Sequence, residues 1–479
     1  MATASLADEP YLIDGKWIAP AERERFDVID PADEQPFARA VQASAADVDA
    51  AVAAAAAAHA DGRWRNLPPE DRARVLIKVA DLIEERLEDL AVLETRDNGK
   101  PIERSRADTA MSARAFRHFS GAPTRIDGKT LPVPGHHVYT RREPVGVAAL
   151  VLPWNFPIMT GCFKLAPALA AGCTVVVKPA EQTPMTMLRV AAICEEAGVP
   201  PGVVNVLTGD GAVGAALVGH PDVKNVSFTG STEVGRLVMG AAAPTTKRLT
   251  LELGGKSPNI VFEDADLDAA TTTAMRASFG HSGQMCTAGS RLLVQRSILD
   301  EMHERLAAAV QKVPMGDGME GGISVGPLVS EEQRQIVLGY IEKGRAEGAA
   351  VAVGGGVPDR PGFFVEPTLF TGVDNTMTIA REEIFGPVVG VIPFEDEAEA
   401  IAIGNDTSYG LAAGVWTRDL SRAHRMGAAL QAGTVWINTY NVFDPALAYG
   451  GRGDSGLGRD LGDEALYAFT ELKSVVIAL

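Results

Sequence analysis

The feature that most constrains the fold is an alternation of short apolar strands and helical segments that begins near residue 145. Five β-branched runs are separated by helical stretches; the predicted strands are 147–152, 174–177, 203–207, 225–228 and 248–253. Strands that are apolar throughout are typical of a parallel sheet covered by helices on both faces. The alternation therefore predicts a doubly wound α/β domain that binds its ligands at the carboxyl ends of the strands. A second alternation, from 259 to about 436, predicts another α/β domain.

Length and charge restrict the class of protein. The chain has 479 residues, a length that suits about three domains. Its net charge of −18 disfavours nucleic acid as a partner, because binding a polyanion requires a basic surface. Its start carries Asp8 and Glu9 in place of a signal peptide's basic and apolar regions, and the longest apolar run, 145–152, is too short to cross a bilayer. We therefore expect a cytoplasmic protein that binds neither nucleic acid nor membrane.

The four cysteines differ in their surroundings. None lies in a CxxC pair or at a Cys/His spacing typical of zinc, so the sequence predicts neither a disulfide framework nor a metal site. Cys162, Cys173 and Cys194 lie among apolar helical residues, as inert buried cysteines do. Cys286 lies among small and polar residues in the segment 280–291 and does not fit that role.

The ends of the chain are less regular. An alanine-rich stretch, 45–60, predicts a helix, and a second helix is predicted from Pro68 and Pro69 to a stop at Asn98-Gly99. The strand-like run 474–477 stands alone at the end of the chain, so it needs a partner sheet in this chain or in a neighbouring one.

Polar or glycine-rich loops follow four of the predicted strands. These loops are 153–157, 178–181, 229–235 and 252–256. Because each loop follows a strand of one parallel sheet, all four are expected at the same edge. Four such loops in succession indicate a binding site better than they indicate simple turns.

Six motifs in this region resemble the NAD(P)-dependent aldehyde dehydrogenase superfamily. They are PWNFP, KPAEQTP, FTGSTEVG, LELGGKSPNIV, GQMCTAGSR and EEIFGPV, and they occur in that family's order. The segment 436–443 is similar to the general aldehyde-oxidising branch. The resemblance covers nearly the whole chain and implies three parts: a Rossmann-type NAD-binding domain (1–124 and 145–253), an α/β catalytic domain (254–455), and a small β oligomerisation arm (125–144 and 456–479).

The resemblance also implies a mechanism. Cys286 would be the nucleophile, since a thiolate adds readily to an aldehyde carbonyl. Hydride would then pass to a nicotinamide and leave a thioester. Asn155 and the backbone N–H of Cys286 would stabilise the oxyanion, and Glu252 would be the general base that activates water to release the carboxylic acid.

The cofactor residues follow from the same resemblance. Lys178 and Glu181 match adenosine-ribose binders, and a carboxylate beside the 2′-hydroxyl favours NAD over NADP because it repels the extra phosphate. Gly230 and Ser231 precede a helix whose N-terminal N–H groups suit a pyrophosphate. The complete predicted set is Leu152, Trp154, Lys178, Glu181, Gly230, Ser231, Gly235, Leu253, Glu383 and Phe385.

Three positions depart from the family's commonest pattern. His281 stands where Asn is frequent, and Tyr449 stands at the usual Phe position. Asp460 stands where an inward-facing Glu assists proton movement in many members, so the shorter Asp460 either relays protons or is structural.

The expected substrate tunnel is apolar and aromatic. By analogy with the family it is lined by Phe156, Met159, Phe163, Met285, Phe443 and Tyr449. A pocket for a second carboxylate needs Arg or Lys, and these six include neither. We therefore expect an apolar or aromatic aldehyde, and highest kcat/KM for succinate semialdehyde would contradict this. A betaine-type substrate stays open, because aromatic rings bind quaternary ammonium groups and Asp444 is near the mouth. A semialdehyde dehydrogenase also stays open as an alternative.

The resemblance implies assembly as well. Relatives associate through an arm, here roughly 125–143, paired with the terminal strand of another subunit, and Arg248, Arg459 and Glu471 resemble an ion-pair group near that interface. We expect a homodimer or homotetramer.

Three other functions remain as alternatives: ester or thioester hydrolysis without redox chemistry, acyl transfer to coenzyme A or phosphate, and a non-catalytic structural role.

Overall fold

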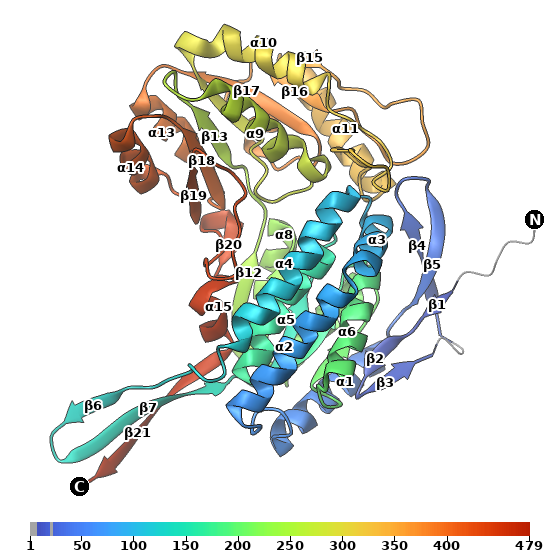
Figure 1. Ribbon diagram of the computed structural model, residues 1–479, viewed down its shortest axis with the longest axis vertical. Helices are drawn as coiled ribbons and strands as arrows, with labels where there is room; N and C mark the ends of the chain where they lie inside the picture. Colours follow the sequence, from blue (N-terminus) through green and yellow to red (C-terminus); the bar gives the residue numbers. More distant parts are fainter. Residues whose placement is uncertain (1–6, 20–22) are drawn as a thin grey trace, which may run out of the picture.

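The structure is a computed structural model that describes residues 7–19 and 23–479. It consists of two α/β parts and a β arm that projects from them (Figure 1). Within the described residues, no helix is long and apolar enough to span a membrane.

An eight-stranded sheet forms the core of the first part, in the order β20-β12-β11-β8-β9-β10-β2-β3. Its strands are β2 (Tyr11–Ile13), β3 (Lys16–Ile18), β8 (Val147–Val151), β9 (Thr174–Lys178), β10 (Val204–Val206), β11 (Asn225–Thr229), β12 (Arg248–Glu252) and β20 (Gly456–Leu457). The five strands from β12 to β10 are parallel, which confirms the predicted sheet. From β8 the chain adds β9 and β10 on one side and then β11 and β12 on the other, so a topological switch point lies between β8 and β11.

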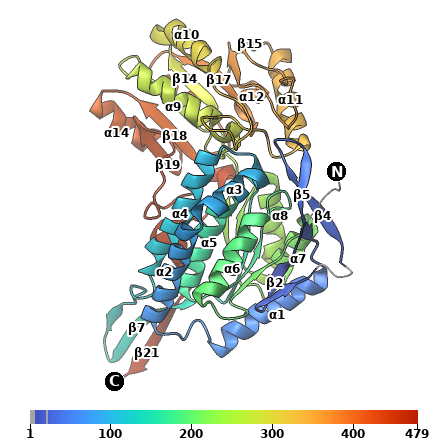
Figure 2. The same cartoon turned by 45° about the vertical axis from the view of Figure 1, so that its right-hand side comes forward.

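Helices cover both faces of this sheet (Figure 2). They are α1 (Ala45–Asp61), α2 (Pro69–Glu85), α3 (Leu87–Asn98), α4 (Ile102–Ser120), α5 (Pro157–Ala171), α6 (Met185–Ala197), α7 (Gly211–Gly219), α8 (Thr232–Ala242) and α15 (Gly462–Ala468). Helices α1 and α7 pack together at β8, α5 and α6 pack on β8 to β10, and α2, α3 and α4 form a further layer over α5 and α6. Every residue of β8 and β9 is buried, which explains their continuous apolar character.

The predicted helix from Pro68 to Asn98 is two helices. Arg86 separates α2 from α3 with φ −105° and ψ 19°, outside the helical range. Both helices bury a face against α4 and α6, so the apolar spacing continues across the break and does not reveal it.

The second part is built on a seven-stranded sheet, in the order β15-β16-β17-β14-β13-β18-β19. Its strands are β13 (Pro258–Val261), β14 (Arg291–Gln295), β15 (Ala350–Val353), β16 (Thr368–Thr371), β17 (Val388–Phe394), β18 (Ala412–Trp416) and β19 (Thr434–Ile437). Its helices are α9 (Leu267–Phe279), α10 (Leu299–Val310), α11 (Glu331–Ala346), α12 (Thr378–Arg381), α13 (Glu397–Asn405) and α14 (Leu420–Ala429). All neighbouring strands are parallel except β15 with β16, so the second predicted alternation is also confirmed.

Two small sheets complete the fold. One joins β1 (Asp8–Glu9), β5 (Gln35–Val41) and β4 (Arg25–Asp30); the other is the arm, in which β21 (Thr470–Ala478), β7 (His136–Pro144) and β6 (Thr130–Val133) are neighbours in that order. Strand β21 pairs antiparallel with β7 of the same chain, from Thr470 opposite Pro144 to Ala478 opposite His136.

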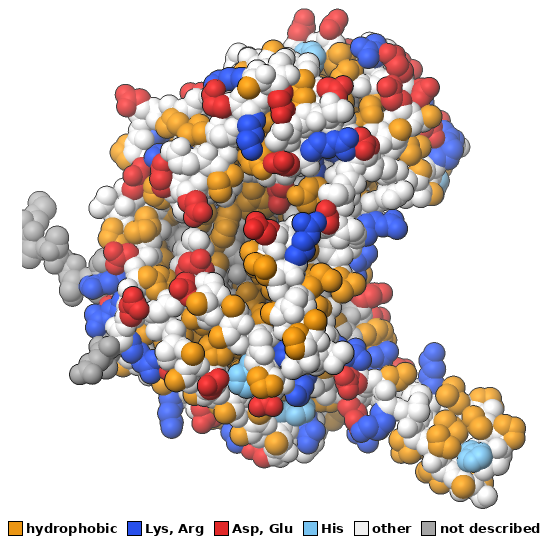
Figure 3. All heavy atoms as spheres, turned by 180° about the vertical axis from the view of Figure 1, so that it is seen from behind, with side chains coloured by type: hydrophobic (Ala, Val, Ile, Leu, Met, Phe, Trp, Pro, Cys, Tyr) orange, Lys and Arg blue, Asp and Glu red, His pale blue; other side chains and the backbone are white. Residues whose placement is uncertain are grey.

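This pairing corrects the expectation that the terminal strand pairs with the arm of another subunit. Strand β20 pairs with β12, and α15 packs against α5. The chain therefore leaves the eight-stranded sheet beside β7, and β21 then runs along β7. The segment 456–479 thus contributes to both the eight-stranded sheet and the arm. Figure 3 shows hydrophobic side chains gathered on the end of the arm. The exposed large hydrophobic residues along the arm as a whole are Leu131, Val133, Leu472, Val476, Ile477 and Leu479.

Candidate active site

The switch point brings together residues that are far apart in the sequence. Asn155 lies in the loop after β8, Gly230 and Ser231 follow β11, and Glu252 is the last residue of β12. Cys286 reaches the same place from the other part of the molecule, in the loop between α9 and β14. Asn155, Glu252 and Cys286 line two adjoining cavities, one on the cofactor side and one on the substrate side.

The loop before Cys286 is held in a strained conformation. His281 and Ser282 have φ of 51° and 56°, which non-glycine residues rarely adopt. Ser282 Oγ donates to Gly326 O at 2.8 Å, and His281 Nε2 donates to Asn155 O at 2.7 Å. Burial holds the pKa of His281 well below its usual value, so its imidazole is neutral. These contacts fix the loop that carries Cys286 against the loop that carries Asn155.

Cys286 is the cysteine that solvent reaches. The other three cysteines are buried, whereas Cys286 is partly exposed. Its Sγ lies 3.1 Å from the Tyr449 hydroxyl. Burial raises the pKa of the Cys286 thiol to about 12, and the hydrogen bond with Tyr449 opposes this increase. The resting thiol is therefore protonated near neutral pH, and reaction requires that this proton be removed.

Glu252 is a buried carboxyl group without hydrogen-bond partners. Its side chain is 3% exposed, and neither carboxyl oxygen is bonded within residues 7–19 and 23–479. Burial raises the pKa of Glu252 well above its usual value, the charge of Asp460 adds to this, and Lys164 and Arg459 oppose it. A carboxylate with a raised pKa and free lone pairs suits a group that takes a proton from water.

A buried ion pair stands beside Glu252. Lys164 on α5 is fully buried, and its Nζ donates to Asp460 Oδ2 at 2.7 Å and to Ser227 Oγ at 2.9 Å. The backbones of Asp460 and Tyr449 exchange two hydrogen bonds, of 2.8 and 2.7 Å. Sequence reasoning singled out Asp460 but missed Lys164, although a lysine within the apolar helix α5 was a signal that could have found it.

Asn155 is oriented by the loop that carries Cys286. Its Nδ2 donates to Gln284 O at 2.9 Å, and the side chain is buried. A carboxamide nitrogen carries two hydrogens, so one N–H remains for an oxyanion formed at Cys286.

The cofactor-side cavity has a volume of about 450 Å³ and is lined by every predicted cofactor residue except Gly235. Gly235 lies on α8 and serves its packing: a Cβ there would lie 2.6 Å from Leu253 Cδ2. Sequence reasoning missed Gly211, Gly214 and Gln333, which also line this cavity. The first two lie in the first turn of α7, which follows the short strand β10 at the same sheet edge.

These residues fit a dinucleotide. Ser231 is the N-cap of α8, whose first N–H groups suit a pyrophosphate. Lys178 Nζ lies 3.0 Å from Glu181 Oε2, so the two residues predicted to bind the adenosine ribose lie together. The rings of Trp154 and Phe385, which also line the cavity, meet edge to face with centroids 5.1 Å apart.

Glu383 lies close to the backbone after β12. Its Oε1 accepts a hydrogen bond from Gly255 N at 3.0 Å, and a Cβ on Gly254 would lie 2.2 Å from its Oε2. Burial raises the pKa of Glu383 to about 7. Glycine at 254 is therefore required for this carboxyl group to reach the cofactor-side cavity.

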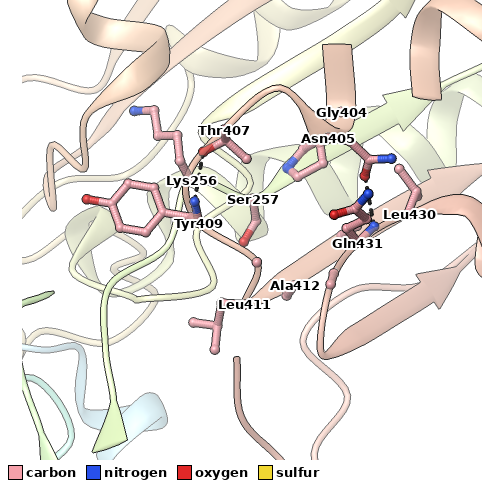
Figure 4. Close-up of a pocket in the computed structure, with 14 residues that line it drawn as sticks. Lys256, Ser257, Gly404, Asn405, Thr407, Tyr409, Leu411, Ala412, Leu430 and Gln431 are labelled. Atoms are coloured by element: carbon pink, nitrogen blue, oxygen red, sulfur yellow. Dashed lines mark hydrogen bonds between the residues drawn. The ribbon is translucent and has the colours of Figure 1, made fainter. Parts of the chain in front are cut away.

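A smaller pocket lies beside Lys256 and is shown in Figure 4. Lys256 and Ser257 are buried, and Nζ and Oγ lack partners within the part of the chain that the structure describes. Burial, with the nearby charge of Arg291, lowers the pKa of Lys256 to about 7. The pocket volume is about 10 Å³, which is room for about one water molecule and not for a substrate.

The substrate-side cavity contains all six predicted tunnel residues together with the three proposed catalytic residues. Phe443 and Tyr449 meet edge to face, with centroids 5.3 Å apart. The cavity volume is about 50 Å³, and Thr160, Thr287, Asp460 and Arg104 also line it. Arg104 on α4 was not predicted, since α4 lies outside every motif that the sequence analysis used.

Comparison with known proteins agrees with this geometry. The sequence model described as "Aldehyde dehydrogenase family" matches residues 17–475. The chain belongs to the aldehyde dehydrogenase family. This confirms the resemblance inferred from the six motifs, and the expected fold with it.

Several members of the aldehyde dehydrogenase family are similar over nearly their full length. An aldehyde dehydrogenase of Aspergillus niger is 47% identical over 466 residues, which is 97% of this chain and 94% of that protein. A betaine aldehyde dehydrogenase of Cereibacter sphaeroides (strain ATCC 17025 / ATH 2.4.3) is 46% identical over 470 residues, 98% of this chain and 97% of that protein. The solved NAD+ complex of an aldehyde dehydrogenase from Bacillus cereus is 45% identical, has a TM-score of 0.97, and covers 98% of this chain and 97% of its own.

Proposed function

We propose that this aldehyde dehydrogenase uses NAD to oxidise an aldehyde to a carboxylic acid through a thioester on Cys286. One observation carries the proposal. Cys286, Glu252 and Asn155 line both the cofactor-side and the substrate-side cavities, so nucleophile, base and oxyanion donor stand where the two cavities meet.

In the first half of the reaction, Cys286 releases its proton to solvent water, and Sγ attacks the aldehyde carbon. A C–S bond forms, and the carbonyl π electrons move to oxygen. The remaining N–H of Asn155 and the backbone N–H of Cys286 stabilise this oxyanion, at about 3 to 4 kcal/mol per donor. Bound NAD would supply the acceptor for the hydride that leaves the same carbon. The carbonyl then re-forms as a thioester on Cys286.

In the second half, Glu252 takes a proton from water, and the resulting hydroxide adds to the thioester carbon. The C–S bond breaks, the sulfur leaves as a thiolate, and the carboxylic acid is released. Burial without hydrogen-bond partners raises the proton affinity of Glu252, and this supports its role as base. Asp460, held by Lys164, modulates that affinity through its charge.

We also propose NAD in preference to NADP. Glu181 is held beside Lys178 by their 3.0 Å ion pair, which keeps a negative charge where the extra phosphate of NADP would bind. Like charges repel, so the phosphate is disfavoured there.

The proposed assembly is a homodimer or homotetramer. The arm exposes the apolar residues named above, and α8 exposes Val234, Leu237 and Met239. Contiguous exposed apolar side chains mark protein interfaces. The pair Arg248–Glu471, 3.3 Å apart, links β12 to β21 at the base of the arm.

We propose the same division into parts as the sequence predicted: residues 1–124 with 145–253, residues 254–455, and the arm.

The test is NADH formation by the purified protein with an aldehyde and NAD, compared with Cys286→Ala. We expect NADH absorbance to increase with the wild type and the signal to vanish in the variant. Equal rates in both would contradict the proposal. Ester hydrolysis without NADH would support the non-redox alternative, and NADH formation that requires coenzyme A or phosphate would support acyl transfer.

A further inference from the structure

A second, wider cavity, which we call the outer cavity, adjoins the substrate-side cavity. The two share Arg104 and Met285 in their linings. The outer cavity has a volume of about 490 Å³, against about 50 Å³ for the inner one. A substrate whose aldehyde group reaches Cys286 has room to extend past Arg104 into the outer cavity.

Arg104 is held in place but is not neutralised at its tip. It lies in the first turn of α4, and its Nε is 3.0 Å from Asp108 Oδ1. Its guanidinium group lies 5.1 Å from the ring centre of Phe156, a tunnel residue. Its two terminal nitrogens make no hydrogen bond within the described chain, and the side chain is 33% exposed.

The neighbouring Lys100 shows the contrast. Its Nζ is fully buried and binds both Glu94, at 2.9 Å, and Asp108, at 3.0 Å. Lys100 is thus fully paired, whereas Arg104 shares only the Nε side of its guanidinium with Asp108. Terminal guanidinium nitrogens that are fixed in position and unbonded form a fork that matches a carboxylate.

The other charges of the outer cavity favour an anion as well. Arg276 is exposed there and has no ion pair among the residues that the structure describes. Glu103 is the acidic residue in the lining, and Arg106 binds it at 2.6 Å. The inner end has the opposite character, because Glu252 and Asp460 line it. The chain as a whole is acidic, with a net charge of −18. Two arginines with unbonded N–H donors therefore make the outer cavity basic in contrast to the rest of the protein.

We propose that the substrate is an aldehyde that carries a carboxylate at its far end, bound by the terminal nitrogens of Arg104 with Arg276 at the mouth. The inference rests on the proposed function, since it names the substrate class of the same site. It also replaces the expectation of a wholly apolar substrate: the six predicted tunnel residues bind the middle of the molecule, and the cation lies outside that set. The carboxyl groups at the inner end and the guanidinium groups at the outer end orient the substrate with its aldehyde inwards.

The experiment compares matched pairs of aldehydes that differ in the terminal group. The pairs are butanal with succinate semialdehyde, pentanal with glutarate semialdehyde, hexanal with adipate semialdehyde, and benzaldehyde with its para-carboxylate. The readout is kcat/KM from NADH formation with NAD. A charged hydrogen bond at Arg104 predicts a ratio of about ten to a hundred in favour of the carboxylate in at least one pair, through a lower KM. The ratio should decrease as salt increases, because Arg276 is exposed.

Variants assign the ratio to Arg104. Arg104→Gln should bring the ratio to about one while leaving kcat/KM for the neutral partner within a few-fold, and Arg104→Lys should keep part of it. Arg117→Gln is the matched control: it removes an arginine of the same helix, α4, that pairs with Asp81 and Glu84 and lines neither cavity, and it should leave the ratio unchanged.

The outcomes separate this inference from the proposed function. A ratio of about one for every pair in the wild type, with NADH formed from the neutral aldehydes, overturns the inference and leaves the function standing. A large ratio that persists in Arg104→Gln also overturns it. Absence of NADH with every aldehyde overturns the proposed function and the inference together.

Discussion

Tyr449 offers a sharp test of how the nucleophile is activated. Its hydroxyl lies 3.1 Å from Cys286 Sγ. Burial raises the pKa of Tyr449 well above its usual value, so the hydroxyl keeps its proton and donates to the sulfur once the thiol is ionised. Tyr449→Phe removes this donor and keeps the ring that packs against Phe443.

The expected effect follows from the energy of one hydrogen bond to a charged group, about 1.5 to 3 kcal/mol. Loss of that stabilisation raises the pKa of the Cys286 thiol and lowers the thiolate fraction at a fixed pH by about ten- to a hundredfold. Alkylation of Cys286 by iodoacetamide, followed across pH, measures this fraction directly. Acylation by an aldehyde should slow in proportion.

Tyr440→Phe is the matched control, because the Tyr440 hydroxyl donates to Thr287 O at 2.9 Å and not to the sulfur. It should leave the alkylation profile in place. A Tyr449→Phe profile that coincides with the wild type, or one that moves to lower pH, would refute the role given to this hydroxyl.

Three further predictions address the base, the cofactor site and the arm. Asp460→Asn removes a charge that raises the pKa of Glu252 and leaves Lys164 unopposed, so the acidic limb of kcat against pH, on which Glu252 ionises, should move to lower pH; an unmoved limb would contradict the coupling. Gly254→Ala displaces Glu383, because its Cβ would lie 2.2 Å from Oε2, and titration calorimetry should show NAD binding weakened about tenfold or more; unchanged affinity would argue against Glu383 as a cofactor residue. Leu472→Asp combined with Val476→Asp charges the exposed face of β21 and should reduce the assembly seen by light scattering, whereas a wild type that is already monomeric would refute the proposed oligomer.

Much of the fold was predictable because the pattern of apolar residues along a segment indicates which of its faces are buried. The continuous apolar runs of β8 and β9 reflect strands buried on both faces. Once the strands are parallel, their loops must share an edge, and this alone placed Asn155, Lys178 and Glu252 near one another. The polar surroundings of Cys286 then distinguished it from the three buried cysteines.

Other features depend on contacts that no local pattern records. Lys164 meets Asp460 across 296 positions of the chain. The position of Arg104 depends on how α4 packs against α5. The sequence of neither helix indicates that the other is its packing partner. The partner of β21 is set by the path of β20 and α15, and the break at Arg86 is hidden because both helices bury the same side.

The central claim, a thioester on Cys286 that Glu252-activated water hydrolyses, is tested most directly by intact-protein mass spectrometry of Glu252→Gln after mixing with an aldehyde and NAD. Loss of a general base slows its step by about 10² to 10⁴, so the acylated enzyme should accumulate. The account predicts a mass increase equal to the acyl group, located on the Cys286 peptide, together with about one NADH per active site before slow turnover. An unmodified Cys286 peptide while NADH is produced, or an undiminished steady-state rate in this variant, would contradict it.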